Sequence, residues 1–62
     1  MDRALELFLN LLTAVEGRDE QALRHVLRAV ACELEEQEQL RVMTTLQESL
    51  DQRGRDLLER IR

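Results

Sequence analysis

Apolar residues recur every three or four positions along most of this 62-residue chain. That spacing places them on one face of an α-helix. Asp2 is a suitable N-cap for a first helix over about residues 2–16, and Gly17 is expected to end it in a left-handed conformation. The apolar stripe of this helix consists of Ala4, Leu5, Phe8, Leu11, Leu12 and Val15.

A second helix is predicted over about residues 19–35, after a tight turn at residues 17–19. Asp19 is its expected N-cap, and Glu20 suits the positive first turn. Its stripe consists of Ala22, Leu23, Val26, Leu27, Val30 and Leu34. Because the turn is short, the first two helices should form an antiparallel hairpin.

The apolar stripe stops at residues 35–39 and resumes on nearly the opposite side of the helix axis, at about 100° per residue. A C-terminal helix is therefore expected over about residues 38–61. Either a turn at residues 35–39 folds it back, or it continues the second helix as one long helix of about 60 Å in total. No Gly, Pro, Asn or Ser marks a turn there, which favours continuity. Gly54, inside the last stripe, either permits close helix approach or frays the final turns.

The first helix carries more apolar surface than one neighbouring helix covers, since Leu7 and Leu9 lie outside its stripe. The displaced apolar stripe of the C-terminal helix must also be buried against a neighbouring surface. These features predict a helical-bundle homo-oligomer, preferably a homodimer, in which Leu7→Glu or Leu9→Glu weakens association more than folding. The predicted interface with a second copy or a protein partner consists of Leu7, Phe8, Leu9, Leu11, Leu40, Met43, Leu46, Leu50, Leu57 and Ile61.

A chain of this length forms one small domain, residues 1–62, whose core supplies only a few kcal/mol. Cys32 is the only cysteine, so no intrachain disulfide supplements that core. His25 and Cys32 lie seven positions apart, which is neither a zinc spacing nor the contact that a nucleophile and its base require. Helix packing and association remain as sources of stability, and no metal or cofactor is expected.

The net charge of −4 and the lack of Trp and Tyr disfavour nucleic-acid binding. The charged residues of 33–51 are all acidic except Arg41, and the last ten residues are rich in Arg, so two antiparallel chains could attract each other. Carboxylates elsewhere lie near Arg at helical spacing, as in Glu20 with Arg24 and Asp56 with Arg60. No run of apolar residues spans a bilayer and no signal-peptide pattern is present, so the expected compartment is the cytoplasm.

No catalytic motif or phosphate-binding loop occurs in the sequence, so an enzyme and a small-molecule substrate are not expected. The predicted function is non-enzymatic protein binding, by a small adaptor, chaperone, inhibitor or anti-activator. In size and helical build the chain resembles secretion-type chaperones, anti-activators and phage-encoded inhibitors. The alternative is a DNA-binding regulator of helix-turn-helix type, in which Arg24, His25 and Arg28 would face the DNA groove.

Overall fold

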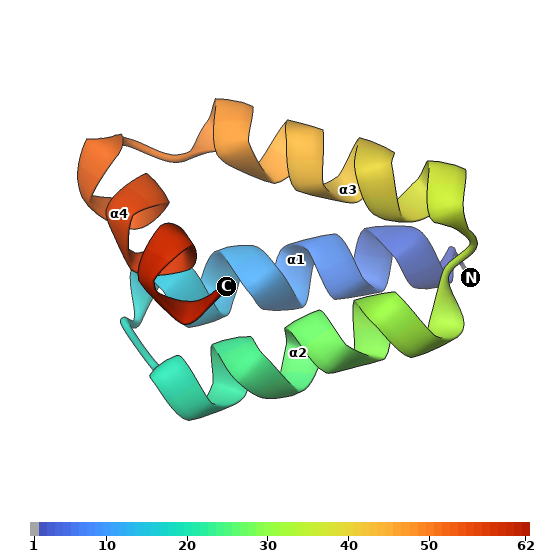
Figure 1. The fold of residues 1–62 in the computed structure, drawn as a ribbon, viewed down its shortest axis with the longest axis horizontal. Coiled ribbons are helices and arrows are strands. Elements are labelled where there is room, and N and C mark those ends of the chain that lie inside the picture. Colours follow the sequence, from blue (N-terminus) through green and yellow to red (C-terminus); the bar gives the residue numbers. More distant parts are fainter. Residues whose placement is uncertain (1) are drawn as a thin grey trace.

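The computed structural model describes residues 2–62, and over that range it contains four α-helices and no strand. The helices are α1 (Arg3–Glu16), α2 (Glu20–Glu33), α3 (Glu36–Ser49) and α4 (Gln52–Ile61). In Figure 1, α1 lies between α2 and α3, and α4 crosses the end of the bundle where α1 finishes. The all-helical fold class is confirmed. No helix among the described residues has the length and apolar character needed to cross a bilayer.

The first two helices begin where the sequence predicts, because an aspartate caps each of them. The carboxylate of Asp2 accepts a hydrogen bond from the backbone N–H of Ala4, at 3.0 Å, and Asp19 caps α2 in the same way. The prediction that Gly17 is left-handed is wrong: its φ is −82°, and Arg18 takes the positive φ of 52° instead. An arginine therefore bears the strain of the turn.

A turn at Leu34 and Glu35 separates α2 from α3, so the prediction of a continuous helix through residues 35–39 is wrong. The backbone of both residues is extended, and the Leu34 side chain is buried in the core. The amide Nε2 of Gln39 donates hydrogen bonds to the carbonyl oxygens of Leu34 and Ala31, at 2.7 and 3.2 Å. The Gln39 side chain thus provides hydrogen-bond donors for carbonyl groups at the C-terminal end of α2, which lack partners within the helix.

A second break, at Leu50 and Asp51, divides the predicted C-terminal helix 38–61 into α3 and α4. As in the first break, an extended, buried leucine precedes an acidic N-cap residue, but here the Asp51 carboxylate accepts a hydrogen bond from the backbone N–H of Gly54, whereas Glu35 makes no such bond. Gly54 lies buried in the first turn of α4, where an added Cβ would stand 3.2 Å from carbon atoms of Val15 and Leu50. The close-approach interpretation of Gly54 is the correct one.

The core is assembled around α1, which makes the principal contacts with each of the other three helices. Leu7 and Leu11 face inward from α1, and Leu23, Leu46, Leu57 and Leu58 meet them from the other helices with essentially no exposed surface. Because α4 folds back onto the end of α1, the chain covers the inner faces of its helices by itself. The remaining helix pairs contact one another less, so the space between α2 and α3 is only partly filled.

Candidate protein-binding surfaces

The residues predicted to form an interface fall into two groups. Half of them lie in the core of the single chain, namely Leu7, Leu11, Leu46, Leu50 and Leu57. The others reach the surface: Leu9 and Leu40 are exposed, and Phe8, Met43 and Ile61 are half-buried. The prediction that Leu7 lies off the intrachain stripe is wrong, because the inner face of α1 packs against three helices rather than one.

One surface runs along α1 and is formed by Leu5, Phe8, Leu9 and Leu12, which we call the α1 outer face. Leu9 lies two positions from both Leu7 and Leu11, or about 200° around the helix, so it points away from the core. Leu5 and Leu9 are 54% and 50% exposed, and the other two side chains are half-buried. Each of them lies three or four positions from two of the others, so they form a continuous patch about two turns long.

Next to this row, a shallow hollow of about 240 Å³ separates α1 from α3. Leu5 and Phe8 form its wall on α1, and Val42 and Thr45 form its wall on α3. Arg41 and the acidic side chains of Asp2 and Glu38 lie at its margin. The α1 outer face is therefore wider than one helix, and a partner helix laid along it would touch α3 as well.

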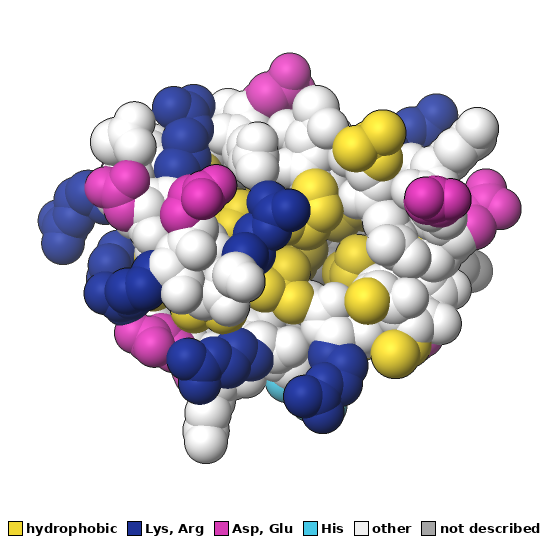
Figure 2. Space-filling view, in the orientation of Figure 1, with side chains coloured by type: hydrophobic (Ala, Val, Ile, Leu, Met, Phe, Trp, Pro, Cys, Tyr) yellow, Lys and Arg dark blue, Asp and Glu magenta, His cyan; other side chains and the backbone are white. Residues whose placement is uncertain are grey.

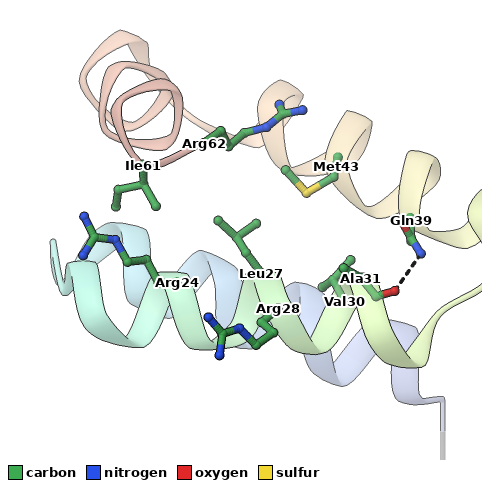
Figure 3. A pocket seen from close by; sticks show the side chains of 9 residues that line it. All are labelled: Arg24, Leu27, Arg28, Val30, Ala31, Gln39, Met43, Ile61 and Arg62. Carbon is green, nitrogen blue, oxygen red and sulfur yellow. Dashed lines mark hydrogen bonds between the residues drawn. The ribbon is translucent and has the colours of Figure 1, made fainter.

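A second surface is the groove between α2 and α3, of about 470 Å³, which we call the arginine groove. In Figure 2 an apolar hollow lies near the middle of the visible face, with arginine side chains around it. Figure 3 shows Leu27 rising from α2, Met43 descending from α3 and Ile61 standing at the end of α4. The residues that line it are Arg24, Leu27, Arg28, Val30, Ala31, Gln39, Met43, Ile61 and Arg62.

The ion pairs of the chain leave the arginines of this groove without a carboxylate partner. Arg60 pairs with Glu20, across the contact of α4 with α2, and Arg3 pairs with Glu33 and Glu6. These are the ion pairs within residues 2–62. The expected pair of Glu20 with Arg24 is thus replaced by a contact distant in sequence, and the expected partner of Arg60, Asp56, instead accepts a hydrogen bond from Gln52.

The Arg3–Glu33 pair ties the start of α1 to the end of α2. Nε of Arg3 lies 2.7 Å from a carboxylate oxygen of Glu33, and a second nitrogen lies 3.1 Å from the other oxygen. This bidentate hydrogen bond lowers the pKa of the Glu33 carboxyl below its ordinary value and raises the pKa of Arg3. Both side chains are nearly half exposed, so solvent screens the pair that links these two helix ends.

Groups that could carry chemistry are dispersed. His25 and Cys32 are both exposed on α2. Among residues 2–62, no three His, Cys, Asp or Glu side chains gather closely enough to hold a metal ion.

Sequence reasoning missed parts of both surfaces. Leu5 and Leu12 belong to the predicted apolar stripe of the first helix, but they lie on its outer edge. Their spacing with Leu9 does contain the signal, since positions 5, 8, 9 and 12 form a helical row of their own. Met43 and Ile61 of the arginine groove belong to the predicted interface, but the sequence gives no signal that Arg62 joins them, because Arg62 reaches the groove only through the fold of α4.

Comparisons of this chain with protein-family models, with curated proteins and with solved structures found no match.

Proposed function

We propose that this chain is a non-enzymatic protein-interaction module, and that two copies pair through the α1 outer face. The observation that carries the proposal is the row of Leu5, Phe8, Leu9 and Leu12 on a helix whose inner face is already buried. Exposed apolar side chains are ordinary when scattered, whereas a contiguous row marks a contact surface. In a pair related by a twofold axis, each copy presents the same row to the other.

The small apolar surface that two copies would bury against each other predicts a weak dimer. Full burial of a leucine is worth about 1.5–3 kcal/mol, so covering the exposed half of Leu5 or Leu9 contributes about 1 kcal/mol. Two such leucines on each of two copies give about 4 kcal/mol, and the half-buried Phe8 and Leu12 add to this. Association costs at least a similar amount. The dimer should therefore form and dissociate with concentration.

The biological role that we propose is that of a small adaptor, chaperone or inhibitor, which acts by holding another protein. The exposed apolar row of the α1 outer face supports this role. We propose the cytoplasm as its compartment, since a single exposed thiol, Cys32, suits a reducing environment.

The test compares Leu9→Glu with the matched variant Leu40→Glu by size-exclusion chromatography with light scattering. Leu40 is 70% exposed on the outer side of α3, so both changes put a carboxylate at an exposed leucine and alter the net charge equally. Leu9→Glu should abolish the dimer, because it buries a charge in the contact, while Leu40→Glu should retain it. A dimer that survives Leu9→Glu, or an unaltered chain that stays monomeric at high concentration, contradicts the proposal.

A further inference from the structure

We infer that the arginine groove binds an acidic amphipathic helix of a partner protein. The inference rests on the proposal that the chain binds proteins, and it uses a different surface from the α1 outer face. None of the four residues of the α1 outer face lines the groove. Pairing of two copies and capture of a partner are therefore separate events, which can be tested separately.

The shape of the groove suits a short length of helix. α2 and α3 form its two sides, and the end of α4 with Ile61 closes one end. At the other end, Gln39 reaches across to the carbonyl oxygen of Ala31. Between Arg24 and Ala31 the groove follows α2 for about 10 Å, at 1.5 Å per residue. Two turns of a partner helix fit in that length.

The floor of the groove is apolar. Leu27 and Val30 contribute from α2, Met43 from α3 and Ile61 from α4. Val30 is only 3% exposed, whereas the other three remain half-buried, with surface that the chain itself leaves uncovered. Methionine adapts its shape to different partners. A helix that presents apolar residues at positions i, i+3 and i+7 would place them on this floor.

The rim of the groove supplies the charge. Arg24 and Arg28 are one helical turn apart on α2, and Arg62 reaches over the groove from the opposite side, at the end of α4 (Figure 3). No acidic residue lines the groove, although the chain has 13 acidic residues and only nine arginines. None of the three arginines forms an ion pair within residues 2–62.

Three unpaired guanidinium groups around an apolar floor select the partner's chemistry. Guanidinium groups bind carboxylates in a planar, bidentate geometry, which favours Glu and Asp on the flanks of the partner's apolar ridge. Duplex DNA offers phosphates but nothing to cover Leu27, Met43 and Ile61, and the net charge of −4 opposes its approach. The combination of apolar floor and arginine rim therefore favours an acidic helix over a nucleic acid.

The experiment uses the full chain and three synthetic peptides of about 15 residues, each held helical by a side-chain cross-link because free peptides of that length are marginal helices. The first peptide has leucines at i, i+3 and i+7 flanked by glutamates. The second has lysines in place of the glutamates, and the third has serines in place of the leucines. Binding is measured by fluorescence anisotropy, and amide chemical shifts locate the site.

The glutamate-flanked peptide should bind at least tenfold more tightly than either of the others, and amide shifts should change at Leu27, Met43 and Ile61. Arg28→Glu should weaken binding of the glutamate-flanked peptide and reduce its advantage over the lysine-flanked peptide, because it leaves only Arg24 and Arg62 to attract glutamates. Arg53→Glu is the control: it changes the net charge equally, but Arg53 does not line the groove. Circular dichroism checks the fold of each variant, and Arg62→Glu replaces Arg28→Glu if the latter fails to fold.

Three results would overturn the inference. The first is that the glutamate-flanked peptide binds no better than the other two. The second is that Arg28→Glu and Arg53→Glu have the same effect, which would show that only net charge matters. The third is that a duplex DNA binds at the groove and the peptides do not. None of these results bears on pairing through the α1 outer face, because the Leu9→Glu experiment reports on that surface alone.

Discussion

Replacing Leu7 and Leu9 in turn by alanine should show that the buried leucine of α1 stabilises the fold far more than the exposed one. The two leucines are two positions apart on α1, but Leu7 is 2% exposed and Leu9 is 50% exposed. Removing a fully buried leucine side chain costs about 2–5 kcal/mol, because the transfer energy is lost and a cavity remains. Leu7→Ala should therefore cost about 3 kcal/mol.

Leu9→Ala should cost much less in the monomer. Only half of its side chain has left water, so the lost transfer energy is about 1 kcal/mol, and no enclosed cavity forms. Alanine also returns a few tenths of a kcal/mol through its higher helix propensity. The expected difference between the two variants is about 2 kcal/mol, or roughly thirtyfold in the unfolding equilibrium constant. In a domain with only about 3–5 kcal/mol of net stability, Leu7→Ala should leave a measurable unfolded population.

Urea unfolding, followed by far-ultraviolet circular dichroism at a concentration low enough to keep the chain monomeric, measures this difference. Leu40→Ala serves as a reference for an exposed leucine, since Leu40 is 70% exposed. Its effect should resemble that of Leu9→Ala. The reasoning fails if Leu9→Ala lowers the unfolding free energy as much as Leu7→Ala does, because the inward and outward faces of α1 would then be assigned incorrectly.

Three further predictions follow from the turns and the ion pairs. Gly17→Ala should leave stability unchanged or raise it by about 0.4–1 kcal/mol, because Gly17 has a right-handed backbone; a clear loss in thermal unfolding would show that it needs a left-handed one. Gly54→Leu should cost about 1–3 kcal/mol by overpacking the contact of α4 with α1, and an unchanged melting temperature would contradict that close approach. The lowered pKa of Glu33 means that its pair with Arg3 stabilises the fold above the unfolded pKa of about 4.3 and loses that effect as the pH falls through the lower folded pKa. Glu33→Gln should therefore reduce the acid sensitivity of the unfolding free energy, and identical pH profiles of variant and parent would rule out this contribution.

The helices with strong local signals could be predicted from the sequence. Asp2 and Asp19 cap α1 and α2 within a residue or two of the predicted starts, and the apolar period marks both helices. The two later breaks could not be predicted in the same way. Leu34 and Leu50 both end a helix with a buried side chain. The turn at Leu34 and Glu35 contains no residue that usually marks a turn. Beside Leu50, Asp51 is a local signal for a helix start, and its carboxylate accepts a hydrogen bond from the backbone N–H of Gly54.

The candidate surfaces were predictable only in part, because burial depends on the fold of α4. The first helix does carry more apolar surface than one neighbouring helix covers, but which leucines stay outside depends on how many helices contact α1. The fold of α4 onto the end of α1 places Leu57 and Leu58 in the core. The same fold brings Arg62 to the rim of a groove that begins on α2, and the sequence contains no local signal for that proximity.

The central claim is that this chain completes its core alone and pairs afterwards through the α1 outer face. Sedimentation equilibrium over a wide concentration range, with circular dichroism on the same samples, tests it most directly. The account predicts that the mass rises from one copy to two while the helical content per residue stays constant, because the core of a single chain is already closed. Helical content that falls as the dimer dissociates would contradict the account, since it would mean that the second copy completes the core.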